Sequence, residues 1–502
     1  MSGLPAWLQG LPDPERMRAT DRWAIEEQGI PGLELMERAG RGLADVVASV
    51  APDGTIAIAC GKGNNGGDGY VAARLLRESG REVRALAVAP VSELSGDARA
   101  SAERVDDVEP FDAARLADCS VAVDALLGTG FSGTPHGAVA DAIEALNDAG
   151  LPIVAADVPS GVDAASGVVE GTAIRARATP TFAAAKPGLW INPGKAHAGT
   201  VRVIDIGIPQ GAPIAEPDVA LIADAELLAL LPSRQAGWTK FTSGHVLVAG
   251  GARGLTGAPS LASEAAQRAG AGYVTACVPA SAQPILAGRL LEAMTRALPE
   301  DDGAHTAAGV EEVLELAERG GALVVGPGLG RSDGAFAFAR DLVRRAEVPV
   351  VLDADGLNAH AGDLAALAGR NAPTILTPHE GELGRLLEVD SSAVAARRLE
   401  HARAAAAQAQ AIVVLKGDDT LVVDPGGLVA VSPGATGALA TAGTGDVLSG
   451  VLAAVLSRGL EPFTAACAGV RLHARAGIHA AHEKGVDGVI ARDVIEALPF
   501  AR

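Results

Sequence analysis

The chain has 502 residues, enough for roughly three domains of ordinary size or for two large ones. Apolar residues make up 48% and charged residues 20%, a balance that supplies sizeable cores and excludes an intrinsically disordered chain. Because 41 basic residues stand against 61 acidic ones, the net charge of −20 excludes a protein that binds nucleic acid or an anionic membrane by cancelling phosphate charge. A small anionic substrate stays compatible with this charge if backbone amides or a few cations meet it locally.

The cysteines and the apolar runs indicate the compartment. The four cysteines contain no C-x-x-C pair, which argues against a disulfide framework or a zinc site and favours a reducing cytosol. No apolar run approaches about 18 residues, so no membrane span is expected. Asp13 and Glu15 come early and no apolar h-region precedes them, so no signal peptide is expected. The predicted location is the cytoplasm.

The expected elements alternate between strand and helix along the whole chain. After a helical opening over 17–50, nearly continuous apolar runs end in Gly or Asp, which is typical of parallel strands covered by helices on both faces. Three prolines within 209–217 predict a linker, and we place the domain boundary after residue 215. The expected strands are Thr55–Cys60, Val83–Ala89, Ser120–Ala125, Ile153–Asp157 and Thr200–Ile206, then His245–Ala249, Tyr273–Val278, Ala322–Val325, Val348–Leu352, Thr374–Leu376, Ile412–Leu415 and Leu421–Val423.

The densest signal is the segment Gly61–Gly69, with five glycines in nine residues between a strand and an expected helix over Tyr70–Glu78. Such a segment brings backbone amides close to a ligand at a helix start. Three of its glycines fit G-x-G-x-x-G, but the acid that a dehydrogenase needs at the end of the second strand is missing, since Glu82 stands at the front of that strand. A glycine-rich turn without a ligand is the plainer alternative.

Two further loops follow strands of the same half. Asp124 ends one strand ahead of Gly128–Gly133, and Asp157–Gly161 closes the next. Loops after the carboxyl ends of parallel strands converge on one crevice, and amide, carboxylate and hydroxyl oxygens suit a hard cation. Helix caps or turn residues are the structural alternative for each acid. We expect these polar side chains to gather in one place: Asn65, Asp124, Asp157 and Ser160.

These segments resemble NAD(P)H-hydrate epimerase over about residues 15–210. The motifs that carry the likeness are Leu35–Gly40, Gly61–Gly69, Val123–Gly128 and Asp157–Asp163. The resemblance implies interconversion of the R and S forms at C6 of the hydrated nicotinamide ring. It also implies a potassium ion held by Asn65, Asp124 and Ser160, and substrate contacts from Asn64, Asn65, Gly66, Gly67, Asp68, Gly128, Thr129, Gly130, Phe131, Ser132, Gly133, Thr134 and Asp157.

Inverting that carbinol carbon requires either loss of its hydroxyl or opening of the ring, and a facing carboxylate can shuttle the proton. Our hypothesis assigns this catalytic role to Asp157. Lys62 is either a counter-charge for a diphosphate or a solvated loop lysine.

The second half carries a phosphoryl-transfer signal. Thr441–Asp446 leads into an expected helix over Val447–Leu456, and glycines at a helix start expose free N–H groups to an anion. Asp446 in that turn can accept the proton of an attacking hydroxyl while the amides stabilise the moving phosphoryl group. The alternative is an ordinary acid in the first turn of a helix.

Four more loops of this half end strands: Gly326–Gly330, Val351–Asn358, Thr377–Glu382 and Lys416–Thr420. Lys416 can reach a nucleotide phosphate. His379 has no second histidine at His-Glu-x-x-His spacing, so a ligand contact is preferred over a zinc site. Asp353 and Asp355 are read equally well as strand-end structural acids or as cleft residues, and Glu382 is a candidate contact to a metal-bound water.

This half is similar to the ribokinase-like superfamily, and within it to NAD(P)H-hydrate dehydratase. The resemblance implies that ATP or ADP phosphorylates the 6-hydroxyl of the S hydrate and that loss of phosphate restores the ring; the choice between ADP and ATP is left open. Mg²⁺ is expected beside the nucleotide on charge grounds. The implied substrate contacts are Ala258, Gly328, His379 and Asp446, and the implied nucleotide contacts are Lys416, Gly417, Asp418, Asp419, Thr420 and Gly445.

The sequence therefore predicts an α/β protein of two tandem three-layer domains, a Rossmann-like epimerase domain over 1–215 and a ribokinase-like dehydratase domain over 216–502. The alternatives are a vitamin-type small-molecule kinase with a dinucleotide-sensing front module, and a binding module without activity. Expected partners are the hydrated dinucleotide and an adenine nucleotide, and a homo-oligomer is left open.

Overall fold

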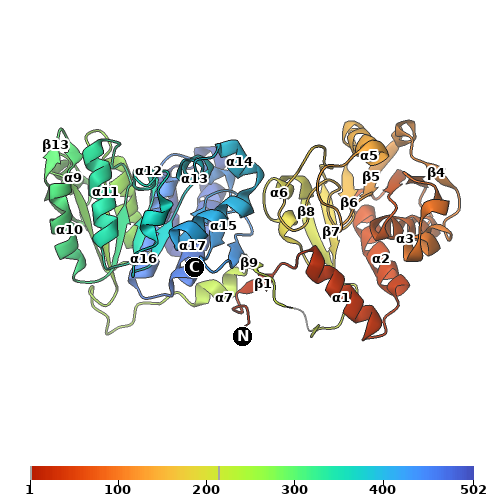
Figure 1. Ribbon diagram of the computed structural model, residues 1–502, viewed down its shortest axis with the longest axis horizontal. Coiled ribbons are helices and arrows are strands. Elements are labelled where there is room, and N and C mark those ends of the chain that lie inside the picture. Colours follow the sequence, from red (N-terminus) through yellow and green to blue (C-terminus); the bar gives the residue numbers. More distant parts are fainter. Residues whose placement is uncertain (1–2, 213–214) are drawn as a thin grey trace. The chain divides into compact units, whose positions relative to one another are not determined.

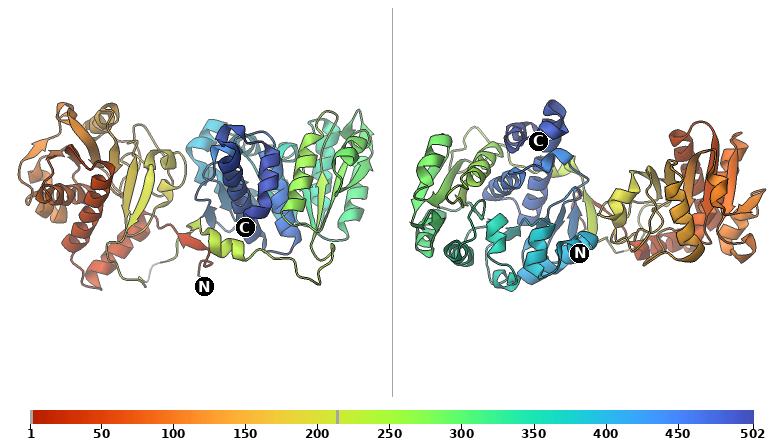
Figure 2. Two further views of the ribbon diagram at one scale, coloured as in Figure 1. Left: turned by 180° about the vertical axis from the view of Figure 1, so that it is seen from behind. Right: turned by 90° about the horizontal axis from the view of Figure 1, so that it is seen from above.

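The computed structural model describes residues 3–212 and 215–502, and the chain forms two compact units (Figures 1 and 2). One unit is Gly10–Val219, and the other is Met1–Gln9 together with Ala220–Arg502. Pro213 and Ile214 of the expected linker lie outside the described residues. Both units are α/β, so the predicted fold class is confirmed.

The unit Gly10–Val219 is built on a seven-stranded parallel sheet in the order β4-β3-β2-β5-β6-β7-β8. Ile56 and Ile58 of β2 belong to the core under α2 and α3, whereas Ala57 and Ala59 belong to the core under α5, which makes three layers. The elements are α1 (Pro14–Glu26), α2 (Gly32–Val50), β2 (Thr55–Cys60), α3 (Asn64–Glu78), β3 (Val83–Ala87), α4 (Gly96–Ala102), β4 (Val108–Pro110), β5 (Cys119–Ala125), α5 (Gly137–Asp148), β6 (Ile153–Ala155), β7 (Ala178–Phe182), α6 (Gly194–Ala198) and β8 (Thr200–Ile204).

Two helix boundaries differ from the expectation. The single helix over 17–50 is α1 and α2, because Gly29 adopts φ +70° and Pro31 cannot continue a helix. The helix expected from Tyr70 begins at Asn64, so the glycine-rich segment is the first turn of α3. Asn65 and Asp68 are consequently helical residues with fixed directions rather than loop residues.

The sheet order places a switch point between β2 and β5. The chain runs outward from β2 through β3 to β4, then returns to β5 and continues through β6, β7 and β8 on the other side. In doubly wound sheets ligands bind in the crevice outside the carboxyl ends of the strands at this point. The loops after Cys60 and after Ala125 therefore flank the expected site.

The larger unit is built on an eleven-stranded sheet in the order β1-β9-β20-β19-β18-β17-β16-β15-β10-β11-β12. The strands from β12 to β18 are parallel, while β18, β19 and β20 pair antiparallel, and the switch point lies between β10 and β15. Its strands are β1 (Leu8–Gly10), β9 (Val219–Ile222), β10 (His245–Ala249), β11 (Tyr273–Pro279), β12 (Met294–Leu298), β15 (Ala322–Val325), β16 (Val350–Leu352), β17 (Thr374–Leu376), β18 (Ile412–Leu415), β19 (Leu421–Val423) and β20 (Val429–Val431), with a separate hairpin of β13 (Glu300–Asp301) and β14 (Ala304–His305).

The helices of this unit cover the same sheet. Val246 and Val248 of β10 share a core with α8, α16 and α17. The helices are α7 (Asp224–Ala229), α8 (Gly257–Arg268), α9 (Gln283–Arg289), α10 (Val310–Ala317), α11 (Asp333–Arg345), α12 (Ala354–Asn358), α13 (Glu380–Leu387), α14 (Ser391–Ala396), α15 (Arg398–Ala409), α16 (Thr444–Ser457), α17 (Pro462–Lys484) and α18 (Ala491–Ala497).

The N-terminal strand β1 belongs to the larger unit. Trp7 and Leu8 are buried in its core, the Trp7 ring lies 6.2 Å from the Phe463 ring of α17, and the Trp7 carbonyl accepts a hydrogen bond of 2.9 Å from the Ala223 amide. The residues ahead of α1 were expected in the first domain. They lie instead at the edge of the other sheet, because burial of Trp7 is a tertiary contact that so short a segment does not reveal.

All four cysteines are buried and free of disulfides, as expected from their spacing. Across residues 3–212 and 215–502, no helix combines the length and the hydropathy that a membrane span requires.

Candidate active sites

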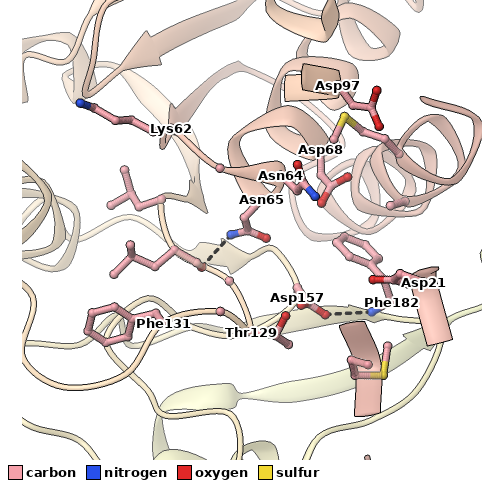
Figure 3. A pocket seen from close by; sticks show the side chains of 18 of the residues that line it. Asp21, Lys62, Asn64, Asn65, Asp68, Asp97, Thr129, Phe131, Asp157 and Phe182 are labelled. Carbon is pink, nitrogen blue, oxygen red and sulfur yellow. Dashed lines mark hydrogen bonds between the residues drawn. The ribbon is translucent and has the colours of Figure 1, made fainter. Parts of the chain in front are cut away.

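A cavity of about 910 Å³ opens at the switch point of the smaller unit (Figure 3). Its wall comes from α1, α2, α3 and α4 and from the loops after β2, β3, β5, β6 and β7, so it collects the segments that the sequence singled out. Of the expected substrate contacts, the wall includes Asn64, Asn65, Asp68, Gly128, Thr129, Gly130, Phe131 and Asp157.

Five expected contacts lie outside this wall: Gly66, Gly67, Ser132, Gly133 and Thr134. Gly66 has a packing role, because a Cβ there would stand 2.1 Å from the Gly61 carbonyl oxygen. Gly63, by contrast, has nothing within 4 Å of a built Cβ and lines the cavity. The glycines of this segment therefore divide between close packing and ligand access.

Asn65 joins the two loops of the switch point. Its Nδ2 donates to the Leu127 carbonyl oxygen at 2.7 Å (Figure 3), while its Oδ1 is buried and has no hydrogen-bond partner among the described residues. A buried amide oxygen without a donor is costly unless an unseen ligand meets it. Gly128 leaves room for this side chain, since a Cβ there would lie 3.3 Å from Oδ1.

Asp124 and Ser160 lie against the same carbonyl. Asp124 is fully buried and accepts from Ser160 Oγ at 2.6 Å, from the Ser160 amide at 2.8 Å and from the Leu126 amide at 3.2 Å. Ser160 Oγ also lies 3.3 Å from the Leu127 carbonyl oxygen. Burial raises the pKa of Asp124 to about 6, against the lowering effect of these hydrogen bonds. The structure thus brings the three expected potassium ligands together as an all-oxygen donor set.

Asp157 faces the cavity through an unusual backbone conformation. Its φ of +63° lies in the left-handed region, which strains a non-glycine residue and is found at functional sites. Its Oδ1 accepts from Lys186 Nζ at 2.5 Å, Thr181 Oγ1 at 3.1 Å and the Phe182 amide at 3.1 Å. Lys186 is 1% exposed, so a buried ion pair holds this carboxylate.

Sequence reasoning missed Lys186 and Asp21, both of which line the cavity. A single cation in the otherwise apolar run 182–189 was the available signal for Lys186, since a buried lysine needs a partner. Nothing in the sequence distinguished Asp21, because many charged residues of its helix face solvent. Lys62 forms an exposed ion pair with Glu93 at 2.5 Å and points away from the acidic residues in Figure 3, which favours the solvated reading.

In the larger unit, two carboxylates contact one lysine. Lys416 Nζ lies 3.0 Å from Asp353 Oδ1 and 3.5 Å from Glu382 Oε2, and Ser449 Oγ donates to Asp353 Oδ2 at 2.6 Å. Burial lowers the pKa of Lys416, but these two carboxylates outweigh it and the pKa is raised. Asp353 is therefore a buried member of this cluster, held by Lys416 and Ser449.

Asp446 lies in the first turn of α16, where free amides point outward. The preceding Gly443 adopts φ +91°, a conformation that glycine allows, and a Cβ built on Gly445 would lie 3.6 Å from Lys416 Nζ. Burial, assisted by Asp353 and Glu382 and opposed by Lys416, raises the pKa of Asp446 to about 7. A carboxyl with this pKa beside a helix N-terminus is suited to proton transfer near neutral pH.

His379 has a structural role on one side of its ring. Its Nδ1 accepts from the amides of Gly381 and Glu382 at 3.0 and 3.3 Å, and Glu382 Oε2 accepts from the His379 amide at 2.9 Å, which caps α13. The side chain is 54% exposed, so Nε2 stays accessible to a ligand. Burial lowers its pKa, and the neutral ring is the form that can accept these two amides.

The loop after β18 is held in place by a buried ion pair and by a hydrogen bond within the loop. Asp419 is 1% exposed and forms an ion pair of 3.0 Å with the equally buried Arg398, which Glu380 also contacts. Thr420 Oγ1 donates to the Gly417 carbonyl at 2.7 Å. The Gly417 amide also lies 3.2 Å from Thr420 Oγ1, so Asp419 and Thr420 shape the loop. Sequence reasoning had no signal for Arg398.

Ala258 and Gly328 meet across the switch point of this sheet. A Cβ on Gly328 would lie 3.3 Å from the Ala258 Cβ and only 2.6 Å from the Leu255 carbonyl, and Gly328 adopts φ +62°. A larger residue would close the gap between the loops after β10 and β15.

The chain has two tandem α/β units, and each carries carboxylates and a lysine at the carboxyl ends of parallel strands. This arrangement defines an α/β enzyme with two sites. Residues 246–500 match the family model described as NAD(P)H-hydrate dehydratase, and residues 32–188 match the model described as YjeF-related protein N-terminus. The chain is 39% identical to the bifunctional NAD(P)H-hydrate repair enzyme Nnr of Moorella thermoacetica, covering 96% of this chain and 95% of the relative. It is 34% identical to the enzyme of that name in Escherichia coli, covering 96% and 92%.

A crystal structure of the ADP/ATP-dependent NAD(P)H-hydrate dehydratase of Bacillus subtilis is 30% identical and covers 55% of this chain and 95% of that chain, with a TM-score of 0.47. The chain belongs to the family of bifunctional NAD(P)H-hydrate repair enzymes. The resemblance stated from the sequence, and the prediction of a bifunctional epimerase and dehydratase over a kinase with a sensing module, are confirmed.

Proposed function

We propose that this chain repairs hydrated NADH and NADPH, with the unit Gly10–Val219 interconverting the R and S forms at C6 and the larger unit dehydrating the S form with an adenine nucleotide. The observation that carries the proposal is Asp446, a carboxyl with a pKa of about 7 at the N-terminus of α16 beside Lys416. Such a pairing suits transfer of a phosphoryl group to a hydroxyl.

The test is an assay of the full chain with purified R hydrate or S hydrate, with ADP, ATP or no nucleotide. Recovery of NADH absorbance from the S hydrate only with nucleotide, and interconversion of R and S without nucleotide, are expected. A phosphorylated small alcohol that accumulates without any recovery of NADH would favour the vitamin-type kinase instead. This assay also decides the preference between ADP and ATP.

In the dehydration, Asp446 accepts the proton of the 6-hydroxyl as that oxygen attacks the terminal phosphorus. The new O–P bond replaces the anhydride bond of the nucleotide, whose shortened form leaves. The C6–O bond then breaks, phosphate departs with the electron pair, and a proton lost from C5 restores the C5=C6 double bond. Lys416 and the amides at Thr444–Asp446 meet the developing charge on the phosphoryl oxygens.

Mg²⁺ fits this site only through the nucleotide. Among the described residues, no group of three or more His, Cys, Asp or Glu side chains could hold a metal ion, and Glu382 Oε2 already contacts the His379 amide and Lys416. Mg²⁺ is commonly held by substrate phosphates, water and one or two carboxylates, and it neutralises phosphate charge when bound.

Dehydratase activity is expected to fall as the pH drops below about 7, because Asp446 must be ionised to accept a proton. Asp353→Asn removes a negative neighbour that raises the pKa of Asp446, so the midpoint of kcat/KM is expected to move to lower pH. A pH profile of both chains from pH 5 to 9 measures the shift. An unchanged midpoint in the variant would contradict the assignment of this limb to Asp446.

Potassium fits the oxygen cluster of the smaller unit. Asn65 Oδ1, Asp124, Ser160 Oγ and the Leu127 carbonyl form the donor set, and the buried Oδ1 that lacks a partner is the atom that a cation would satisfy. Bound there, the ion would tie the loops after β2, β5 and β6 and so fix the wall of the substrate cavity.

Replacing potassium by tetramethylammonium is therefore expected to lower the epimerisation rate about tenfold or more. Added potassium should also raise the melting temperature of the smaller unit in the unmodified chain and in Lys62→Ala, whose exposed ion pair with Glu93 involves none of the donor atoms. Asn65→Ala should abolish that rise. The same melting response in Asn65→Ala would argue against this site. The cytoplasmic location stays a prediction.

A further inference from the structure

One end of the cavity in the smaller unit contains carboxyl groups that have no assigned catalytic role so far. Asp21 of α1, Asp68 of α3 and Asp157 after β6 all line it, and Figure 3 shows their carboxyl groups directed into the same space. Lys186 is the buried cation that faces them. The charged groups of the cavity wall are Arg18, Asp21, Lys62, Asp68, Glu93, Asp97, Asp157 and Lys186.

The Asp157 carboxylate is held through one of its oxygens, in a buried ion pair with Lys186. All three donors that contact its carboxylate in the described residues bond to Oδ1, which leaves Oδ2 for a ligand. The Lys186 ammonium is fully used, because it also donates to Thr181 Oγ1 and to the Phe182 carbonyl, both at 2.9 Å. Lys186 therefore acts on Asp157 and does not itself reach the substrate.

The surroundings of the Asp68 carboxyl group are opposite to those of Asp157. It is 8% exposed, and neither a cation nor a hydrogen-bond donor of the described residues contacts its carboxyl group. Burial first, and then the negative charges of Asp157 and Asp21, raise its pKa well above the ordinary value, and Lys186 only partly opposes them. Burial also raises the pKa of Asp21, against Lys186. Neighbouring carboxyls with opposite environments are the usual arrangement of an acid beside a base.

We propose that Asp68 is the acid and Asp157 the base of the epimerisation, and that Lys186 is a positioning residue that holds Asp157 through Oδ1 and leaves Oδ2 for the substrate. This inference rests on the proposed epimerase function and names the groups that perform it.

The step is a reversible ring opening. Asp157 Oδ2 accepts the proton of the 6-hydroxyl, the O–H electron pair forms the C6=O bond, and the C6–N1 bond breaks with its pair moving to N1. Asp68 donates its proton to N1. After rotation about C5–C6, N1 adds to the other face of the aldehyde while Asp68 recovers its proton and Asp157 returns its own to oxygen. Both carboxyl groups regain their starting states, and no co-reactant is consumed. Loss of the hydroxyl as water would instead leave the two protonation states exchanged.

The test uses the full chain without nucleotide, which silences dehydration, and follows R to S conversion by chromatography. Asp68→Asn keeps the size and neutrality of the side chain but cannot transfer a proton, so kcat is expected to fall at least about 100-fold with KM changed less than about threefold. Asp53→Asn, an exposed aspartate of the same unit outside the cavity wall, is the control and is expected to stay within about threefold of the unmodified chain. Dehydration of the S hydrate with ADP, in the same preparations, should be unchanged, and the melting temperature of the unit Gly10–Val219 reports whether the substituted unit is folded.

Lys186→Gln separates positioning from general structure. The Lys186 ammonium lowers the pKa of Asp68, so without it the basic limb of epimerase kcat is expected to move to higher pH, whereas a merely structural role would lower activity at all pH values alike. Asp157→Asn should be as inactive as Asp68→Asn. Retention of epimerase activity within about threefold in Asp68→Asn, or loss in Asp21→Asn with Asp68→Asn active, would overturn the assignment.

Oxygen labelling tests the ring opening itself. In water enriched in ¹⁸O, the C6 oxygen is expected to exchange no faster than in an enzyme-free control, since the C6–O bond is never broken. Exchange that keeps pace with epimerisation overturns this step. An unmodified chain that does not epimerise at all would refute the proposed function, whereas an active unmodified chain with an active Asp68→Asn variant refutes only this inference.

Discussion

Asp446→Asn is expected to lower the turnover of the dehydratase about 10³-fold or more, because the asparagine cannot accept the proton of the attacking hydroxyl. The amides at the start of α16 and Lys416 stay in place in this variant, so nucleotide binding should persist. The measurement is recovery of NADH absorbance from the S hydrate with ADP or ATP.

Two controls accompany this variant. Epimerisation without nucleotide should be unchanged, since it depends on the other unit. Ser449→Ala removes a hydroxyl that donates to Asp353 but leaves Asp446 itself, and a loss of less than about tenfold is expected. If Asp446→Asn turned over within about tenfold of the unmodified chain, the proton would have another acceptor.

Trp7→Ala is expected to destabilise the larger unit by about 3 kcal/mol or more, because it empties a buried aromatic site beside Phe463. Removing residues 3–9 should have a larger effect, since it also uncovers the edge of β9 and takes away the partner of the Ala223 amide. The measurement is the melting temperature of the larger unit, together with the dehydratase activity that survives heating.

Gln9→Ala, an exposed position on the same segment, is the matched control and should melt like the unmodified chain. The melting of the unit Gly10–Val219 should not change in any of these variants. An unaltered melting temperature for Trp7→Ala would show that β1 is dispensable. If the prediction holds, a fragment that begins near residue 216 lacks a strand of its own sheet, and assays of isolated halves must account for it.

Most strands that the sequence predicted are buried apolar runs. Thr55–Cys60 and His245–Ala249 are nearly uninterrupted runs of this kind, and the structure reproduces both. The missed strands include edge and atypical strands: β7 contains Pro180 and two threonines, β12 is largely exposed, and β1 is only three residues long. Because β7 is nevertheless buried along its whole length, its composition and not its exposure hid it.

The polar loops after strands were also predictable, since parallel strands bring their carboxyl ends to one edge. Asn65, Asp124 and Ser160 do meet around Leu127. The lysines were harder to interpret. Lys416 was expected to reach a nucleotide phosphate, and in the structure it pairs with Asp353 and Glu382. Lys186, which pairs with Asp157, was not singled out from the sequence.

What the sequence by itself determined is the fold class, the two units, the family and the loops that carry the chemistry, because these depend on local runs of apolar residues and on motifs a few residues long. Only the tertiary structure decided which carboxyl groups have raised pKa values. Asp68 and Asp446 take their raised pKa values from burial and from charges that approach from other elements of the fold. Coulomb energy and desolvation depend on distances in space, so the chain had to fold before an acid and a base could be distinguished.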